Sequence, residues 1–326
     1  MYIITFLLLC FLSVVYLKLA DKLNIIDKPN QRSSHTVPTI RGGGILFVVA
    51  FLLDQMSVGF TEIYFSIAVL LIATVSFIDD LVTLSPKIRF PFQMVTVTLV
   101  IYQIGLFNLP IWIPLITIFL GTAFINFYNF MDGINGITGL YSIAVLIGIY
   151  TVNFSTPVIS NQLIAYELLA LVVFGYYNFR KKARFFAGDI GSMSMAIILA
   201  YMILTLLYKF QSPIYILLFV VYGIDATITV FYRALIKENI TEAHRHHIYQ
   251  KLVDRTPLTH LQVAGLYSVL QLVIVVFIWF VLPYPIEIHY MFTVGIILLM
   301  IILYVLIYIK MENIIKVNKQ RSFPNS

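Results

Sequence analysis

Polar side chains that could handle an anionic substrate lie in short stretches between long apolar runs. The most distinctive stretch, 126–139, holds Asn126, Asn129 and Asp132 together with three glycines. Glycines that interrupt hydrophobic sequence indicate backbone that bends sharply or approaches a ligand closely. The i, i+3, i+6 spacing of Asn126, Asn129 and Asp132 would project all three toward one side of a helix. We expect a polar ligand here, although asparagines that only join neighbouring helices would also explain the pattern.

Carboxylates suited to a divalent cation stand at two other places. Asp79 and Asp80 are adjacent at the end of an apolar run, where desolvation and mutual repulsion are unfavourable unless a cation or a proton transfer needs them. Asp189 opens a further apolar run within the pattern Gly-Asp-x-Gly-Ser. Magnesium that bridges phosphate groups is the usual partner of such oxygen ligands. The structural alternatives are a water-exposed helix end for the pair and an N-capping role for Asp189.

Basic and imidazole side chains gather in two more stretches. Arg32, His35 and Arg41 precede or adjoin three consecutive glycines, which predicts either anion binding by backbone N–H and guanidinium groups or a turn-rich connector. The stretch 233–261 holds four of the six histidines. Zinc ligation by three histidines within four residues would be difficult from one helix, so a cluster that binds a diphosphate is the better fit. The residues of this cluster are His244, Arg245, His246 and His247.

The elements that position these stretches are expected to be membrane helices. Of the 326 residues 60% are hydrophobic and 11% charged, far from the composition of a soluble domain. A helix needs about 20 apolar residues to cross a bilayer. The sequence therefore predicts an all-α, polytopic membrane protein with about eleven spans, or ten if the second, weakened by Asp54 and Gln55, does not cross. The spans lie near 2–20, 43–60, 62–78, 90–107, 111–128, 136–153, 161–178, 191–208, 213–233, 262–282 and 289–310.

Basic residues predict the orientation of these spans. Alternate connections hold 19 of the 21 Lys and Arg residues, so the positive-inside rule places the N-terminus outside and the C-terminus in the cytoplasm. The net charge of +6 is then a topology signal that needs no nucleic-acid partner. The first span has no basic flank or cleavage site and is expected to be retained, and a single cysteine, Cys10, allows no disulfide within the chain. Two carboxylates remain inside spans: Asp225, about 12 Å from the cytoplasmic edge, could support the site, and Glu167 has no assigned role.

The ordered set of motifs resembles the polyprenyl-phosphate N-acetylhexosamine-1-phosphate transferases of glycosyltransferase family 4, which include phospho-N-acetylmuramoyl-pentapeptide transferase. The branch that initiates O-antigen, capsule or teichoic-acid glycans is the most similar. The motifs are Asp79-Asp80, Asn126-x-x-Asn129-x-x-Asp132-Gly, Gly188-Asp189-x-Gly-Ser192 and His244-x-His246-His247.

The resemblance implies transfer of a sugar 1-phosphate from a UDP-N-acetyl sugar to undecaprenyl phosphate, with release of UMP. It implies one transferase domain, 1–326, in a bacterial plasma membrane, possessing a cytoplasmic site built from 21–42, 79–90, 126–139, 178–192 and 233–261. Mg²⁺, or Mn²⁺ in its place, would be held by Asp189 and Asp80. Asp79 would act as a base or would position the lipid phosphate, and Asp132 would complete the catalytic set. The expected substrate-binding residues are Asn126, Asn129, Asn135, Arg32, His35, Arg41, His244, Arg245, His246 and His247. The oligomeric state stays open, with a homodimer as one alternative.

One position departs from the family pattern. An acidic residue usually stands three positions after Asp132, and here the residue is Asn135. Asparagine keeps an oxygen acceptor but loses a charge, which weakens the expectation of metal binding by this loop. Three alternatives stay open: lipid I synthesis by a phospho-N-acetylmuramoyl-pentapeptide transferase, an inactive paralogue that acts as a scaffold, and a transporter, for which polar residues near the bilayer midplane and internal repeats would be expected.

Overall fold

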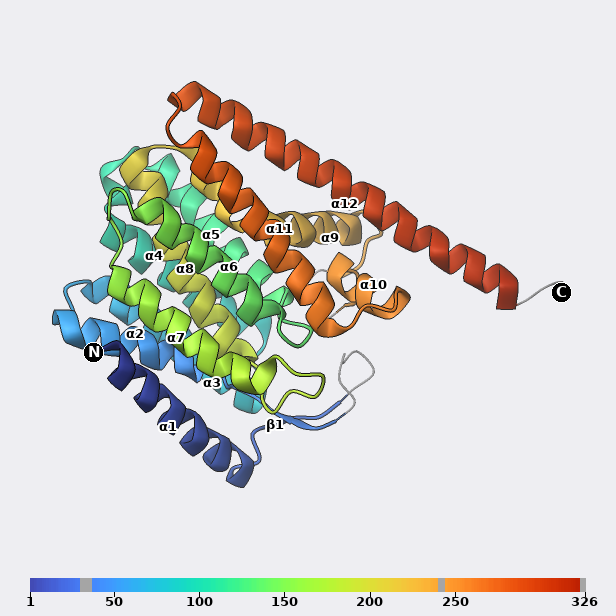
Figure 1. The fold of residues 1–326 in the computed structure, drawn as a ribbon, viewed down its shortest axis with the longest axis horizontal. Helices are drawn as coiled ribbons and strands as arrows, with labels where there is room; N and C mark the ends of the chain where they lie inside the picture. Colours follow the sequence, from blue (N-terminus) through green and yellow to red (C-terminus); the bar gives the residue numbers. More distant parts are fainter. Residues whose placement is uncertain (30–36, 240–243, 323–326) are drawn as a thin grey trace.

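The computed structural model describes residues 1–29, 37–239 and 244–322, and almost all of the secondary structure in these ranges is helical (Figure 1). Two short strands, β1 Ile26–Asp27 and β2 Thr39–Ile40, form an antiparallel pair, and short 3₁₀ segments occur at η1 Leu106–Asn108 and η2 Pro213–Phe219. The helices are α1 Tyr2–Lys22, α2 Ile45–Val58, α3 Ile63–Val82, α4 Pro86–Ile104, α5 Trp112–Phe130, α6 Ile137–Asn153, α7 Asn161–Asn178, α8 Gly188–Phe210, α9 Val220–Leu235, α10 Ile248–Arg255, α11 His260–Val281 and α12 Ile286–Ser322.

The helices confirm a multi-pass membrane protein of the all-α class. Within the described ranges, seven helical segments are long and apolar enough to cross a bilayer: α1, α3, α5, α8, the combined η2 and α9, α11 and α12. The other predicted spans coincide with α2, α4, α6 and α7, which are shorter or more polar. The number of crossings and the side on which each terminus lies stay predictions.

The second span is weak because polar side chains are buried at its far end. Asp54 and Gln55 are each 1% exposed, and Asp54 accepts hydrogen bonds from Gln55 (3.2 Å) and from Gln162 of α7 (3.1 Å). Gln55 in turn accepts a bond from Ser66 of α3 (3.1 Å). These contacts join α2 to its neighbours and satisfy groups that would be costly to leave unpaired in an apolar environment.

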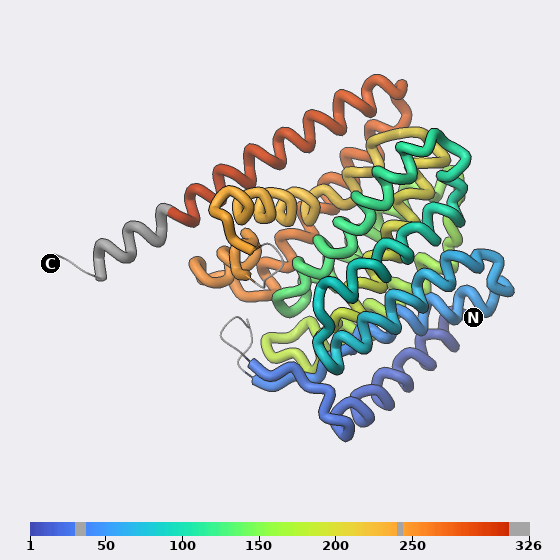
Figure 2. Tube along the Cα trace, turned by 180° about the vertical axis from the view of Figure 1, so that it is seen from behind, coloured from blue at the N-terminus to red at the C-terminus, as the bar shows by residue number. Residues whose placement is uncertain are grey.

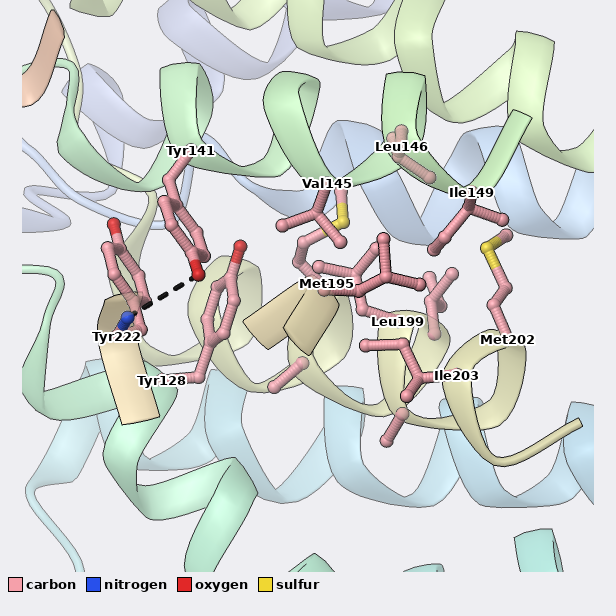
Figure 3. Packing of buried hydrophobic residues seen from close by; sticks show 14 of the residues in the cluster. Tyr128, Tyr141, Val145, Leu146, Ile149, Met195, Leu199, Met202, Ile203 and Tyr222 are labelled. Atoms are coloured by element: carbon pink, nitrogen blue, oxygen red, sulfur yellow. Dashed lines mark hydrogen bonds between the residues drawn. The ribbon is translucent and has the colours of Figure 1, made fainter. Parts of the chain in front are cut away.

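The core is organised around α8, the most buried of the long apolar helices. Met195, Leu199 and other side chains of α8 pack against Val145 and Ile149 of α6 (Figure 3). At the same level Tyr141 of α6 stacks on Tyr222 of α9, with ring centroids 3.5 Å apart. By contrast α1, α5 and α12 carry mostly exposed apolar side chains, as expected of helices that face lipid.

The connections that carry the chemically interesting residues lie together at one end of the helix bundle. Figures 1 and 2 place β1 and β2, the α5–α6 turn, the α7–α8 loop and α10 at this end, which we call the site end. The short helix α10 was not expected from the sequence, and it occupies the middle of the stretch 233–261. Arg32 and His35 fall outside the described residues.

Candidate active site

Two loops far apart in sequence are joined by backbone hydrogen bonds at the site end. Ile40 pairs with Phe185, the N–H of Phe186 donates to the carbonyl of Ile40 (2.8 Å), and the N–H of Gly43 donates to the carbonyl of Phe186 (2.8 Å). The N–H of Gly44 continues the series to the carbonyl of Ala187 (3.0 Å). This pairing fixes the segment around Arg41 against the start of α8.

The three consecutive glycines serve this pairing, and the prediction that their N–H groups bind an anion is wrong for two of them. The N–H groups of Gly43 and Gly44 are both used by carbonyls of the α7–α8 loop. A Cβ at Gly43 would lie 2.1 Å from the Phe185 ring, and one at Gly44 would lie 2.1 Å from Cα of Gly191. The glycines are therefore needed because two backbones touch.

Asp80 caps the first turn of α8. Its Oδ1 accepts the N–H of Asp189 (2.8 Å), and its Oδ2 accepts the N–H of Ile190 (3.1 Å). The first N–H groups of a helix lack partners within the helix, and a carboxylate there also meets the positive end of the helix dipole. Asp80, rather than Asp189, therefore supplies the cap, and its carboxylate is completely buried.

Two arginines link the three predicted carboxylates. Arg41 places Nε 2.6 Å from Asp80 Oδ1 and Nη2 3.0 Å from Asp189 Oδ1. Arg89 places Nη1 2.6 Å from Asp79 Oδ2 and 3.3 Å from Asp189 Oδ2. Asp189 thus lies between the two guanidinium groups, and we call these five residues the acidic centre. Both arginines keep part of their surface exposed, so they can reach an anion that arrives from solution.

Arg89 was missed by sequence reasoning, which counted it only as a topology signal. A physical signal was present, since Arg89 stands in the first turn of α4 after Pro86. A cation near a helix N-terminus is repelled by the positive end of the helix dipole. An arginine at this position therefore indicates that carboxylates lie nearby to compensate. The partners come from α3 and α8, and their proximity could not be read from the local sequence.

The two asparagines of α5 are joined to neighbouring helices. Asn129 Oδ1 accepts the hydroxyl of Ser192 from α8 (2.7 Å), which brings the α5 end beside the acidic centre. Asn126 exchanges hydrogen bonds with Gln93 of α4, the shorter being 2.8 Å from Asn126 Nδ2 to Gln93 Oε1. Asn126 and Asn129 lie on one helix as predicted, but α5 ends at Phe130, so Asp132 lies in the following turn.

Asp132 is partly buried next to the acidic centre. Its Oδ1 accepts the hydroxyl of Thr138 at 2.5 Å. Burial raises the pKa of the Asp132 carboxyl to about 6, although the Thr138 hydrogen bond and the nearby charge of Arg41 act in the opposite direction. A carboxyl with this pKa changes charge close to physiological pH.

Asn135 uses its amide to shape the α7–α8 loop. Its Nδ2 donates to the carbonyls of Arg180 (3.0 Å) and Lys181 (3.3 Å). One residue further on, the N–H of Gly136 donates to Asn178 Oδ1 (2.8 Å). Because an aspartate could donate neither bond, the amide of Asn135 has a structural role at this position.

The histidine cluster lies at the start of α10. The rings of His244 and His247 are 4.9 Å apart, and His246 stacks on His244 at 5.8 Å between centroids. Tyr249 fixes α10 to the α5–α6 turn, because its hydroxyl donates to the carbonyl of Phe130 (3.0 Å). The cluster and Asp132 are therefore held on adjoining segments.

Two members of this cluster are engaged by nearby carboxylates. Arg245 forms an ion pair with Asp254 of α10 (2.7 Å between Nη2 and Oδ1). His246 Nε2 lies 3.1 Å from Glu238 Oε1. A role for Arg245 or His246 in binding a diphosphate stays a prediction, and it would require these contacts to open.

The acidic centre fits a magnesium ion that shares its coordination with substrate. Mg²⁺ is commonly held by one or two carboxylates plus phosphate oxygens and water. Among the described residues no group of three or more acidic, histidine or cysteine side chains forms a closed cage for a metal. Asp189 is the most exposed of the three carboxylates, followed by Asp79. The oxygens of Asp80 are already occupied by hydrogen bonds from two backbone N–H groups and by the contact with Arg41.

The helical architecture defines the class as a polytopic membrane protein, in which two arginines and three carboxylates form the acidic centre. The profile of the family described as Glycosyl transferase family 4 matches residues 62–207, so this part of the chain is similar to that family. That range includes Asp79, Arg89, Asp132 and Asp189.

Individual relatives match over a larger part of the chain. A probable undecaprenyl-phosphate N-acetylglucosaminyl 1-phosphate transferase of Bacillus subtilis is 26% identical over 280 residues, covering 77% of this chain and 76% of the relative. An undecaprenyl-phosphate alpha-N-acetylglucosaminyl 1-phosphate transferase of Thermotoga maritima is 25% identical, covering 78% of this chain and 81% of the relative. A phospho-N-acetylmuramoyl-pentapeptide-transferase of Flavobacterium psychrophilum is 30% identical, covering 43% and 40%.

Proposed function

We propose that the protein transfers an N-acetylhexosamine 1-phosphate from a UDP-sugar to a polyprenyl phosphate. An oxygen of the lipid phosphate attacks the sugar-linked phosphorus, the bond from that phosphorus to the oxygen bridging toward the uridine side breaks, and UMP leaves. The products are a polyprenyl-diphosphate sugar and UMP. This would be the first membrane step of a bacterial surface glycan, carried out at the cytoplasmic face.

The single observation that carries this proposal is the acidic centre. Three carboxylates and two guanidinium groups converge from α3, α4, α8 and the segment before α2. Phosphoryl transfer between two anions depends mainly on positioning and on stabilising negative charge. Arg41 and Arg89 can exchange a carboxylate contact for a phosphate contact, because guanidinium binds both in the same planar geometry.

Magnesium, when bound at Asp189 and Asp79, would screen the two approaching anions and stabilise the transferred phosphoryl group. Asp80 would act indirectly, because it holds the N-terminus of α8, and therefore Asp189, in place. Because a phosphate is already ionised near neutral pH, Asp79 would position the lipid phosphate and would not need to remove a proton from it.

An apolar groove offers a place for the prenyl chain. A cavity of about 420 Å³ between α9 and α12 is lined by Phe231, Val305 and other side chains. A second cavity, of about 300 Å³ and between α5 and α9, shares Ile224 and Thr227 with the first. The shared residues make the two cavities neighbours along α9, and their walls are almost entirely apolar, as a lipid tail requires.

The donor has a separate candidate cavity at the site end. About 370 Å³ in volume, it is lined by Asn135, the Phe186 ring, Lys182 and His260 among others. An aromatic wall, amide and hydroxyl groups and nearby cations suit a nucleotide. The donor would therefore enter between the α7–α8 loop and the start of α11.

An assay with a panel of donors tests this proposal and distinguishes it from lipid I synthesis. That alternative is suggested by the name of the Flavobacterium relative. Purified protein would receive undecaprenyl phosphate and either UDP-GlcNAc, UDP-GalNAc or UDP-MurNAc-pentapeptide, each labelled in the sugar. We expect a labelled lipid with one of the first two donors, together with an equal amount of UMP. Product from the muramoyl donor alone would favour lipid I synthesis, and no product from any donor would contradict the proposal.

A further inference from the structure

Asp225 is a buried carboxylate outside the acidic centre, and four donors surround it. His247 Nδ1 (3.2 Å) and the N–H of Ile248 (3.2 Å) approach its Oδ1 from the start of α10. Thr229 of α9, the helix that also carries Asp225, donates to Oδ1 (3.3 Å), and Tyr267 of α11 donates to Oδ2 (2.7 Å). The side chain is completely buried. Asp225 therefore ties the histidine cluster to α9 and α11.

The second ring nitrogen of His247, Nε2, takes no part in these contacts. The residue is only 1% exposed, and its Nε2 has no hydrogen-bond partner among the described residues. Because a carboxylate only accepts hydrogen bonds, Nδ1 carries a proton in the pair with Asp225. Buried polar atoms are nearly always paired, so an unpaired Nε2 beside Phe130 and His244 indicates a place where a ligand atom is expected.

We propose that Asp225 is a positioning residue for phosphoryl transfer, which holds His247 as an imidazolium so that Nε2–H donates to a phosphate oxygen of the donor diphosphate. This inference rests on the proposed function. No bond is made or broken at His247, and its proton stays on Nε2 during the transfer. Asp225 acts only through the imidazole, by fixing its orientation and by offsetting its charge.

Several ionisable groups surround His247. His244 lies beside it, and burial, reinforced by His247 and by Arg233 of α9, lowers the pKa of His244 to about 3, so that this ring stays neutral. His246, the third ring of the cluster, faces Glu238. Among the residues that the structure describes, the hydroxyls of Tyr249 on α10 and Tyr267 on α11 also lie nearby, with Tyr304 of α12 next to Tyr267. Within the described ranges, Asp225 is the carboxylate in contact with the ring.

The pH profile of transfer tests this role. Asp225→Asn keeps the shape of the side chain and removes its charge, so the imidazolium should lose its proton at lower pH. We expect the alkaline limb of kcat to move down by at least one pH unit, with a loss of activity at pH 8 of about 10-fold or more, which is the factor that one pH unit represents. Thr229→Val removes a neutral hydrogen bond to the same oxygen and should leave the limb in place. A decrease by the same factor at every pH would overturn the proposal.

A double substitution tests whether Asp225 acts through His247. Asp225→Asn combined with His247→Ala should be no slower than His247→Ala alone, because the positioning group then has nothing to position. Losses that multiply would contradict the proposal. If Asp225→Asn does not fold, Asp225→Glu keeps the charge and should show reduced activity with the alkaline limb at the wild-type pH; a limb displaced downward would contradict it.

Protein labelled with [¹⁵N]histidine separates failure of this inference from failure of the proposed function. The His247 signal is identified by its loss in His247→Ala. We expect Nδ1 to be protonated in the wild type, and the ring to lose its charge at lower pH in Asp225→Asn, even if no donor is turned over. A His247 Nδ1 without a proton would contradict the inference. The expected spectrum together with a lack of turnover would count against the proposed function alone.

Discussion

At the scale of single residues, Arg41 balances negative charge that would otherwise be buried. It contacts both Asp80 and Asp189, and the Asp80 carboxylate has no exposed surface. Removing one partner of a buried ion pair leaves the other charge uncompensated. Because Arg41 is itself 30% exposed, solvent screens its charge, and the loss of stability on its removal should be smaller than for a fully buried pair.

Arg41→Ala is expected to lower the free energy of unfolding by about 2 kcal/mol in the absence of divalent cations. Added Mg²⁺ should restore more stability to this variant than to the wild type, because the ion supplies the missing positive charge. Thermal unfolding in detergent, with and without MgCl₂, measures both effects. An equal response of the two proteins to Mg²⁺ would contradict the placement of the metal at this centre.

Asn135 is the residue for which the structure changes the expectation most. Asn135→Asp, which introduces the acidic residue that the resemblance leads one to expect, should reduce transfer more than Asn135→Ala does. The carboxylate would face the carbonyls of Arg180 and Lys181, which now accept the amide, whereas alanine removes the bonds without repulsion. Steady-state kinetics with varied donor compares the two variants. An Asn135→Asp protein as active as the wild type would show that the amide is not needed.

The acidic side of the pH profile reports on Asp132. Its pKa is raised to about 6 by burial and is lowered by the bond from Thr138. If the ionised form is required, kcat/KM falls as pH falls through about 6. Thr138→Val removes the stabilising bond, raises the pKa, and should move this limb up by about 1 pH unit, since a hydrogen bond to a charged group contributes about 1.5 kcal/mol.

The lipid phosphate also titrates near pH 6, and its limb would not respond to a substitution at Thr138. Thr122→Val is a matched control, because the Thr122 hydroxyl donates to a carbonyl of its own helix, that of Ile118. An acidic limb that stays in place in Thr138→Val would assign that limb to the substrate and remove Asp132 from the pH dependence.

At the scale of elements, the site depends on how closely α2 and α8 approach. A Cβ added at Gly44 would lie 2.1 Å from Cα of Gly191, so the two helix starts meet backbone to backbone. Arg41 precedes α2 and Asp189 opens α8, and the contact between the helices therefore sets the separation of the arginine from the carboxylate.

Gly44→Ala should force these two elements apart and reduce transfer at least 10-fold while the protein remains folded. Gly265→Ala is the control, since a Cβ there would meet nothing within 4 Å. Gel filtration and the rate of UMP release would be measured for both variants. Full activity in Gly44→Ala would mean that the α2–α8 contact does not position the site.

The same elements show what a sequence can and cannot reveal. Apolar runs of span length located the helices well, and the carboxylates Asp79, Asp80 and Asp189 were correctly expected to lie near one another. Arg89, the capping role of Asp80 and the pairing of Gly43 with Phe186 were not expected. The Arg89–Asp189 pair, the Asp80 cap and the Gly43–Phe186 bond each join segments 100 or more residues apart, and local periodicity carries no information on such contacts.

At the scale of the whole molecule, the helices hold polar loops from both halves of the chain at one end of the bundle (Figure 1). Exposed apolar side chains on α1 and α12 face outward, and the groove along α9 is open between α5 and α12. A lipid phosphate and a soluble donor could therefore approach one centre from the membrane and from water. A transporter would instead need a polar path through the middle of the bundle, whereas the arginine-clamped carboxylates are gathered at the site end.

The most direct measurement compares Mg²⁺-dependent UMP release by the wild type with that of Asp189→Asn and Asp254→Asn. Asp189 lies between both arginines, whereas Asp254 pairs with Arg245 on the surface of α10. With undecaprenyl phosphate and the preferred UDP-sugar, Asp189→Asn should lose at least 100-fold in kcat, and EDTA should abolish release by the wild type. Asp254→Asn should remain within a few-fold of the wild type. Undiminished release by folded Asp189→Asn, or release that persists in EDTA, would contradict a metal-dependent acidic centre.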